Sequence, residues 1–523
     1  MRTSTWNQLA KAIAFISAVL CVYAVRQVDA DFWGYLDAGR LFATQGLTHT
    51  DPFAYTSAHS PWITFEYGAE LALWWAYRYG GTLGLLALKG LLGGACLACV
   101  YATFRAVDTR TSTWLPLFLL TASGVSRFFL FRPQLFTFAL FAAFVLILFR
   151  HALGKRSALW CLPLGTALWV NTHGGFVAGL AAIGLTIALE TAGALHALGW
   201  QPQAIVRRTR ALWIALGCSV VATFANPLGP RVWVYVLTEL THGTNRRYIR
   251  EWAPATFQND AWSTWVLIVI ALSLSLAAIA ALLLGRATSR RAIGAPPLMW
   301  ALTGVPLLVM AAQSVRHTPL AAIWAGPVIA LLAAEVADEL ASRAIFRQAW
   351  FVLRGLAVVP VMLTVFVVSS TPAPRIRTDG AILGRTHPCR AVGSLRATGV
   401  KAHLYTPLWW GSYVTWHLYP SVQVAMDGRN ISLFPDTMVE ENLRFYTRPA
   451  PDVDPGVPLR YDTDLLLVPT DSPAIARVRG DARWRELYGD SDAAVFSRTD
   501  RPSVLAALRL DPAPSTSCPA YFQ

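Results

Sequence analysis

The sequence predicts a polytopic α-helical membrane protein with a small α/β domain at its carboxyl end, and three observations support this prediction. The 523 residues are 55% hydrophobic and only 14% charged, whereas soluble domains carry about 25% charged residues. The mean hydropathy of +0.43 is too high for one aqueous fold to bury the apolar surface. Many of the 21 Trp residues stand at the edges of apolar runs, and amphipathic rings prefer the headgroup level of a bilayer.

A membrane-spanning helix needs about 20 apolar residues, and the sequence contains about eleven runs of nearly that length. The runs begin around Leu9, Thr82, Thr113, Gln134, Ser157, Gly174, Ala211, Trp262, Pro297, Thr318 and Trp350. A signal peptide is the rival interpretation of the first run. No small-residue cleavage site follows Tyr23, which favours a retained span.

Short basic loops predict the orientation of these spans, because cytoplasmic loops are enriched in Lys and Arg. If the amino terminus is cytoplasmic, every cytoplasmic loop is basic. These loops hold Arg105 and Arg110; Arg150, Lys155 and Arg156; Arg207, Arg208 and Arg210; Arg286, Arg290 and Arg291; and Arg343 and Arg347. Topology then explains the net charge of +14, and no nucleic-acid partner is expected. An odd number of spans places a large first loop, residues 27–81, and the tail on the same external side.

The tail, residues 371–523, differs in composition from the transmembrane domain predicted for residues 1–370. Its segments HLYTP, VQVAMDG, DLLLVP and AAVFS are typical of strands, and WWGSYVTWHL, PDTMVEENLRFY and SPAIARVRG of helices. This alternation predicts a small extracytoplasmic α/β domain. The tail also contains Cys389 and Cys518. An oxidising compartment would permit them to pair, and the sequence leaves that pairing open.

The first loop contains the acidic residues that are the strongest candidates for catalysis. Asp29 and Asp31 follow the first span directly, and residues two apart point the same way on an extended chain. A helix is predicted from Phe32 onward, so Asp31 stands where a helix cap belongs, and both a cap and a catalytic role are open for it. Asp51 with Pro52 predicts a turn. Glu66 and Glu70 are one helical turn apart, so both could line a cleft or both could lie on an exposed helix face.

Basic residues in the predicted external turns form a second candidate set. External loops should be poor in Arg, so Arg at several of them suggests a phosphate or carboxylate partner. Lys89 lies inside the second predicted span, where ionisable groups usually face a cavity or a partner. Binding to lipid headgroups or snorkelling is the alternative for each residue alone. The set comprises Lys89, Arg132, His173, Arg316 and His317.

An aromatic group in the tail allows two interpretations. Trp409, Trp410, Tyr413 and Trp416 lie within one short segment. Aromatic surfaces often stack on sugars, which would make this segment an acceptor site, but the same residues are typical of packing within the tail or against the membrane. Asp427, which precedes Gly428, predicts a turn after a strand.

Several segments resemble those of a broad bacterial group within the GT-C glycosyltransferases, and the resemblance covers most of the chain. The segments are DFWGYLDAGRLFATQG, DPFAYT, FRPQLF, WVNTHGGF, ANPLGP, VRHTPL and AMDGR. The resemblance implies an inverting hexosyl- or pentosyltransferase in the bacterial cytoplasmic membrane. Its donor would be a polyprenyl-phosphate or polyprenyl-diphosphate sugar, and its extracytoplasmic acceptor a glycan, a lipid or a protein.

The resemblance also implies roles for the candidate residues. Asp29 would be the base, and Asp31 would assist it or join it in binding Mg²⁺ or Mn²⁺. The cationic residues Lys89, Arg132, His173, Arg316 and His317 would bind the phosphate, and Glu66 would contact substrate.

Two other classes of function stay open at the sequence level. A transporter or flippase for lipid-linked saccharides or other amphipathic substrates would also have many spans and external cations. It predicts ionisable groups throughout the bilayer depth, whereas here charge clusters at the span ends apart from Lys89. The third class is a non-enzymatic assembly or sensor protein with the tail as its working module.

Overall fold

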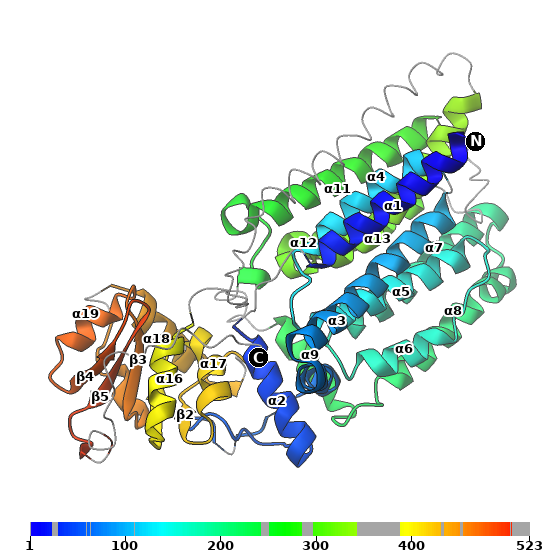
Figure 1. The fold of residues 1–523 in the computed structure, drawn as a ribbon. Coiled ribbons are helices and arrows are strands. Elements are labelled where there is room, and N and C mark those ends of the chain that lie inside the picture. Colours follow the sequence, from blue (N-terminus) through cyan, green and yellow to red (C-terminus); the bar gives the residue numbers. More distant parts are fainter. Residues whose placement is uncertain are drawn as a thin grey trace. The chain divides into compact units, whose positions relative to one another are not determined.

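The computed structural model describes residues 2–23, 30–58, 60–62, 64–108, 110–241, 250–284, 297–342, 387–429, 433–449, 453–502 and 504. The chain forms two compact units. We call residues 1–25 with 86–373 the helical unit, and residues 26–85 with 374–523 the mixed unit. Each unit is described by itself (Figure 1).

The helical unit is built from long apolar helices. Helix α3, Tyr67–Val107, begins in the mixed unit and leaves helical geometry at Gly81, where φ is 53°. The other elements are α1 Arg2–Tyr23, α4 Thr111–Ser126, α5 Gln134–Ala152, α6 Cys161–Trp169, α7 Phe176–Leu198, α8 Pro202–Ala222, α9 Arg231–Thr241, η1 Arg250–Trp252, α11 Phe257–Leu284, α12 Pro297–Gln313, η2 Val315–His317 and α13 Thr318–Ser342.

Six helices among the described residues are long and apolar enough to cross a membrane, as a multi-pass membrane protein requires. They are Thr5–Tyr23, Tyr67–Val107, Gln134–Ala152, Phe176–Leu198, Asp260–Leu283 and Val315–Val336. The runs predicted from Thr113 and Pro297 form shorter apolar helices. The run from Trp350 lies outside the described residues, so the count of about eleven spans stays a prediction.

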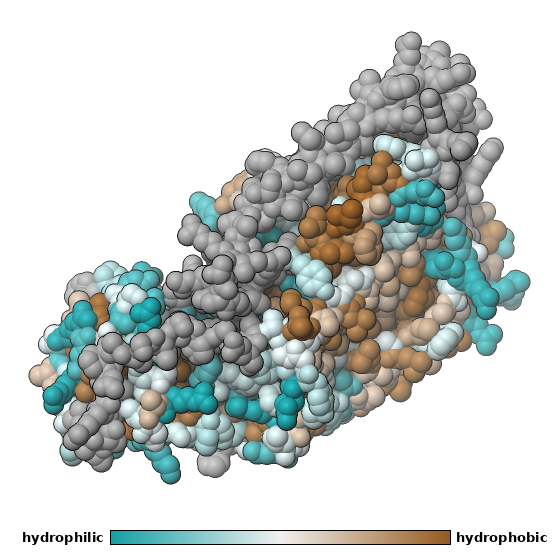
Figure 2. All heavy atoms as spheres, in the orientation of Figure 1, coloured by the Kyte–Doolittle hydropathy of each residue, from teal (hydrophilic) through white to brown (hydrophobic). Residues whose placement is uncertain are grey.

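Helix α13 forms the centre of the helical unit and packs against α4, α5, α11 and α12. Small residues permit this packing: a side chain at Gly326 would meet Thr121, and one at Gly124 would meet Ala322. Figure 2 shows hydrophobic side chains gathered on the face of this unit that it presents. Exposed Leu272, Leu276 and Leu283 of α11 contribute to the apolar surface, which suits contact with lipid rather than water.

The mixed unit contains a five-stranded sheet with the order β2-β1-β3-β5-β4. The strands are β1 Ala402–Tyr405, β2 Val422–Val424, β3 Leu465–Pro469, β4 Trp484–Gly489 and β5 Ala493–Arg498. Strand β1 is parallel to β2 and β3, and β5 is antiparallel to β3 and β4. The four strands predicted from the sequence are present, and β4 is an addition.

The helices of the mixed unit come from both ends of the chain. They are α2 Phe32–Gln45, α16 Cys389–Thr398, α17 Leu408–Leu418, α18 Asp436–Thr447, η5 Val457–Tyr461 and α19 Ala474–Arg479, with the first turns of α3. The three helices predicted for the tail correspond to α17, α18 and α19. Cys389 is disulfide-bonded, and its partner lies outside the described residues.

The first loop is part of the same unit as the tail. Ala54 forms a parallel bridge with Val424, and the backbone N–H of Tyr55 donates to the carbonyl of Val424 at 3.1 Å. Phe53 and Trp62 are buried in an apolar cluster with Tyr419 packed against it. The compact units therefore divide the chain differently from the predicted 1–370 and 371–523, because the loop buries its apolar residues against the tail.

Candidate functional site

The acidic pair is only partly described. Asp29 lies outside the described residues, whereas Asp31 stands at the first turn of α2. Asp31 occupies the cap position but its side chain makes no capping hydrogen bond. Its carboxylate instead lies against the backbone of Gly428, since a Cβ at that glycine would come within 2.4 Å of Asp31 Oδ1.

Gly428 belongs to a tight turn that follows β2, Asp427–Arg429. Its backbone N–H donates to Ser412 Oγ of α17 at 3.3 Å. Two more glycines permit the close approach around the turn: a Cβ at Gly411 would lie 2.2 Å from the carbonyl oxygen of Met426, and one at Gly34 would lie 2.4 Å from Arg429 Cγ. The carboxyl ends of parallel strands commonly carry functional residues, and this turn is at such an end.

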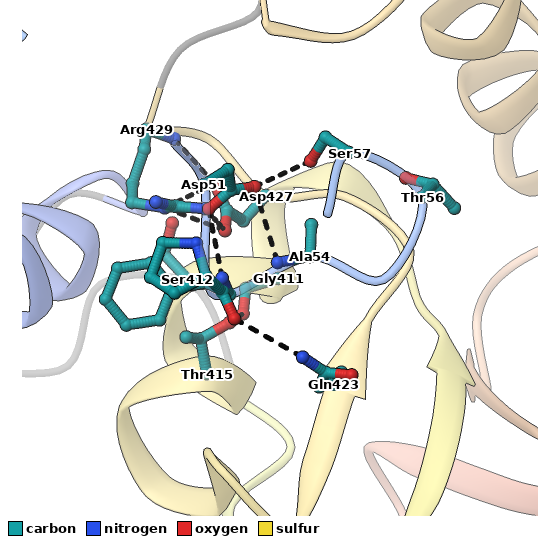
Figure 3. Close-up of polar contacts among 12 residues, drawn as sticks. Asp51, Ala54, Thr56, Ser57, Gly411, Ser412, Thr415, Gln423, Asp427 and Arg429 are labelled. Carbon is teal, nitrogen blue, oxygen red and sulfur yellow. Dashed lines mark hydrogen bonds and ion pairs between the residues drawn. The ribbon is translucent and has the colours of Figure 1, made fainter. Parts of the chain in front are cut away.

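Arg429 is the centre of a buried ion-pair cluster (Figure 3). Its Nε donates to both carboxylate oxygens of Asp427 at 3.0 and 2.9 Å, and its Nη2 donates to Asp51 Oδ1 at 2.9 Å. The arginine side chain is 3% exposed and both carboxylates are fully buried. The guanidinium carbon lies 4.3 Å from the ring centre of Phe53 and 4.8 Å from that of Trp62. Burial makes this pairing obligatory, because an unpaired buried charge is very costly.

Asp51 confirms the predicted turn and also joins the loop to the tail. Its carboxylate accepts the backbone N–H of Phe53 at 3.0 Å and the hydroxyl of Ser57 at 2.6 Å. It is therefore held by its own loop while it pairs with Arg429 of the tail. The sequence indicated the turn but not the ion pair.

A third carboxylate lies in the same cluster. Asp37 of α2 is fully buried and accepts a hydrogen bond from Arg40 at 2.6 Å. Burial raises the pKa of Asp37 to about 8, although the charges of Arg40 and Arg429 oppose that rise. At neutral pH Asp37 therefore holds a proton, which reduces the negative charge buried beside Asp427.

Glu70 and Glu66 take different places near the start of α3. Glu70 is buried and accepts a hydrogen bond from the hydroxyl of Thr64 at 3.1 Å. Its backbone carbonyl lies where a Cβ at Gly39 of α2 would fall, so α2 and α3 pack closely there. The exposed-face alternative is therefore wrong for Glu70. The backbone carbonyl of Glu66 accepts the N–H groups of Ala69 and Glu70, and the substrate role of its side chain stays a prediction.

The aromatic segment of the tail packs against the first loop. Trp33 of α2 lies 5.5 Å from Tyr413 and 6.1 Å from Trp416, between ring centres. Trp416 also contacts Trp74, and Arg40 lies over its ring at 4.6 Å. The packing interpretation thus explains these two residues. Trp410 is buried as well, while Trp409 is 37% exposed.

The predicted phosphate ligands belong to the helical unit, and we call them the cationic cluster: Lys89, Arg132, His173, Arg316 and His317. Arg132 Nη1 donates to both oxygens of Glu251 at 2.9 Å. Arg316 lies over the Trp252 ring at 4.2 Å, and the His317 ring is 6.4 Å from it.

Two further observations connect members of the cationic cluster. Lys89 is buried, with its Nζ 5.0 Å from the ring centre of Phe131, which adjoins Arg132. Burial, together with the charges of Arg316, His317 and Arg132, lowers the pKa of His173 well below its ordinary value. The charges of all three therefore act on His173, although the three residues come from segments distant from it in sequence.

The short η1 segment, together with Ala253 just after it, is joined by hydrogen bonds to the turn that contains Ser314. Ser314 Oγ donates to the carbonyl of Glu251 at 3.1 Å, and the backbone N–H of Val315 donates to Ala253 at 3.1 Å. Glu251 was not predicted from the sequence, where it is one acid in a long loop. The sequence signal that could have identified Glu251 is its place just after three arginines, Arg246, Arg247 and Arg250.

The structure thus brings together the cationic candidates in one unit, while Asp31 and Glu66 lie in the other. Asp427 and Arg429 are the residues of the mixed unit that sequence reasoning missed. Among the described residues, no group of three or more His, Cys, Asp or Glu side chains is arranged to hold a metal ion. The proposed cation ligands Asp29 and Asp31 therefore stay a prediction.

Comparison with protein-family models found no match, and neither did comparison with curated protein sequences. Solved structures do resemble this chain. The oligosaccharyltransferase AglB from Archaeoglobus fulgidus, in complex with an inhibitory peptide and a dolichol-phosphate, has a TM-score of 0.55 at 13% identity, covering 88% of this chain and 69% of that one. A complex of the Archaeoglobus oligosaccharyltransferase with Zn and sulfate has a TM-score of 0.50 at 11% identity, with coverages of 93% and 73%.

The arabinofuranosyltransferase AftD from Mycobacteria has a TM-score of 0.53 at 16% identity, covering 94% of this chain. This chain spans 41% of AftD. These neighbours are GT-C glycosyltransferases. The resemblance that the sequence suggested is therefore confirmed at the level of the fold.

Proposed function

We propose that this chain, which has the fold of the GT-C glycosyltransferases, transfers a sugar from a polyprenyl-phosphate-linked donor to an extracytoplasmic acceptor. Its location would be the bacterial cytoplasmic membrane, with the amino terminus cytoplasmic and the mixed unit outside. The donor class is supported by the dolichol-phosphate bound to AglB. The observation that carries the proposal is the cationic cluster, because it provides the charge that a lipid phosphate needs.

The residue types of the cluster favour an anionic ligand. Arg132 and Arg316 are permanently charged, and Lys89 is a further cation. Glu251 pairs with Arg132, and the charges of Arg132, Arg316 and His317 all act on His173. Cationic side chains gathered in this way stabilise the phosphate that leaves when the glycosidic bond breaks. The side chains would act at the headgroup level, with the polyprenyl tail between apolar helices.

The acceptor would be activated by the acidic end of the first loop. Asp29 is proposed as the base that takes the proton of the acceptor hydroxyl, and Asp31 assists it. In a single displacement the acceptor oxygen bonds to the anomeric carbon as the bond to the phosphate oxygen breaks, and the electron pair leaves with the phosphate. This reaction inverts the anomeric centre. Mg²⁺ or Mn²⁺ bound by Asp29 and Asp31 would orient donor and acceptor.

The organisation of the mixed unit supports the proposed topology. The first loop and the tail pack into one unit, so both have to lie on one side of a membrane. The disulfide at Cys389 is typical of an oxidising compartment. Both features agree with an extracytoplasmic acidic site.

The test uses the full-length protein in liposomes with labelled polyprenyl-phosphate hexoses and pentoses. Asp29→Asn with Asp31→Asn should lower transfer at least about 100-fold, whereas exposed Asp471→Asn should leave it unchanged. Arg132→Ala and Arg316→Ala should weaken binding of polyprenyl phosphate, with exposed Arg156→Ala as the control. Full transfer by the folded double Asn variant would sink the role of the acidic pair, and unchanged phosphate binding would sink that of the cluster.

A further inference from the structure

The hydrogen bonds around His173 determine which ring nitrogen carries a proton. The backbone N–H of Gly175 points at His173 Nδ1 at a distance of 2.9 Å. A backbone N–H can only donate, so Nδ1 has to be the acceptor in this bond. A neutral imidazole that accepts at Nδ1 carries its proton on Nε2.

A second donor reaches the same nitrogen. Trp169 Nε1–H donates to Thr137 Oγ1 at 2.8 Å, and Thr137 Oγ1 lies 2.8 Å from His173 Nδ1. Because the indole N–H occupies the threonine oxygen as a donor, the threonine hydroxyl can direct its own proton to the imidazole. Thr137 and Trp169 are both buried, so water does not replace these bonds readily.

The tight turn at Gly175 holds its backbone N–H close to the His173 ring. A Cβ at Gly175 would lie 2.4 Å from Thr137 Oγ1 and 3.0 Å from His173 Nδ1. The backbone N–H therefore approaches the ring closely, and it cannot rotate away as a hydroxyl can. Protonation of Nδ1 would set its own N–H against the N–H of Gly175, two donors facing each other, which is costly in a buried place.

The charged groups around His173 favour the same state. Arg132 comes from the turn before α5, and Arg316 and His317 come from η2. All three disfavour a further positive charge on the ring. A bound phosphate would partly cancel their effect, but it would not remove the two donors at Nδ1.

We infer that His173 is a neutral hydrogen-bond donor that presents Nε2–H to an anionic phosphate oxygen, with Thr137 and the Gly175 backbone as its positioning elements. The inference deepens the proposed function and rests on it for the identity of the anion. His173 then supplies no proton to the leaving group. A phosphate monoester needs none, because it departs as a stable anion at neutral pH.

Protonation can be measured without any sugar transfer. Full-length protein labelled with ¹⁵N-histidine in lipid nanodiscs gives the ring resonances, and His173 is identified by the signals lost in His173→Gln. We expect an unprotonated Nδ1 and a protonated Nε2 throughout the range from about pH 5 to 8. Thr137→Val removes one of the two donors and should shift the titration of the ring toward that range, and Thr137→Ser should restore the wild-type behaviour. A proton on Nδ1, or titration of wild-type His173 near about pH 6.5, would overturn the inference.

The anion role is tested by two amides that mimic different ring nitrogens. The amide N–H of His173→Gln can replace Nε2–H, whereas His173→Asn reaches only the position of Nδ1. Farnesyl phosphate should bind the Gln variant about as tightly as wild type and the Asn variant about 10- to 100-fold more weakly. Equal affinities for Gln and Asn would overturn the donor role. If wild type binds no farnesyl phosphate, the donor role and the proposed function both fail, while the NMR result still decides the tautomer.

Discussion

The two charged clusters of this protein differ in the kinds of charge that they hold. In the mixed unit, Arg429 pairs with Asp51 and Asp427, and all three side chains are buried. In the helical unit, the charges of Arg132, Arg316 and His317 all act on His173, and Glu251 is paired with Arg132. Charges that are buried and paired with one another hold segments together. A cluster in which cations gather is suited to bind an anion.

This comparison separates structural from functional candidates better than residue type does. In the sequence Asp427 predicts only a turn, and in the structure Asp427 and Arg429 pair with each other and with Asp51. The carboxylate of Asp31 lies against the backbone of Gly428 in the same turn. The buried cluster therefore positions the acidic end of the first loop.

The largest expected effect is the removal of the central charge in the mixed unit. Arg429→Met keeps the length of the side chain but leaves Asp51 and Asp427 buried without their partner. Breaking such a pair costs about 3–5 kcal/mol, so the variant should lose the mixed unit at a lower temperature. Thermal unfolding of the full-length protein, with proteolysis within residues 26–85, measures this. Exposed Arg485→Met is the matched control, and equal stability of the two variants would show that the cluster does not hold the loop.

The ionisation of Asp37 predicts how the stability of the mixed unit depends on pH. Its folded pKa of about 8 lies above the unfolded value of about 3.9. Between these values the folded state binds more protons than the unfolded state, so stability falls as pH rises through this window. The slope is at most about 1.4 kcal/mol per pH unit. Asp37→Asn should flatten the fall in melting temperature between about pH 5 and 8. A variant that keeps the full wild-type slope would contradict this assignment.

A smaller effect is expected where the buried cluster meets Asp31. Gly428→Ala would place a methyl group 2.4 Å from Asp31 Oδ1, and displacement of a reacting group by about 1 Å can cost 100-fold in rate. We expect a loss of transfer of about 10- to 100-fold with donor binding retained. Gly393→Ala is the control, since nothing lies within 4 Å of a Cβ there. Wild-type turnover by Gly428→Ala would show that Asp31 does not depend on this turn.

The smallest expected effect concerns the acid in the cationic cluster. Glu251→Gln would release Arg132 from its ion pair with Glu251 and make the net charge of the cationic cluster more positive. Binding of polyprenyl phosphate should tighten by about 5- to 10-fold, the equivalent of about 1 kcal/mol. Glu486→Gln breaks the exposed pair with Arg479 and should change nothing. Weaker binding by Glu251→Gln would mean that Glu251 supports the anion site instead of competing with it.

Sequence reasoning predicted the helical class and four of the strands, and it selected the cationic residues as phosphate ligands, a role that stays a prediction. These predictions rest on local patterns such as apolar length and basic residues in turns that are predicted to be external. The packing of the loop against the tail could not be predicted in this way, because the bridge from Ala54 to Val424 depends on contacts between distant segments. Strand β4 was not predicted from the sequence, because exposed Arg485 and Glu486 interrupt its apolar pattern.

Sequence reasoning can select a candidate where a residue's surroundings contradict its type, as for Lys89 within an apolar run. It cannot predict an ion pair in which two charged residues neutralise each other across the fold. Arg429 resembles any turn residue until Asp51 is seen beside it. Glu251 gains its meaning from Arg132 in the same way.

The union of the first loop with the tail has a consequence for how the protein is made. Residues 30–58 leave the ribosome long before residues 402–429, which supply their partners in the sheet and the Arg429 cluster. In the proposed topology, the loop therefore waits outside the membrane until nearly the whole chain has been synthesised and inserted. An incomplete chain carries the loop but not the tail residues that pack against it, so the mixed unit can form only late in synthesis.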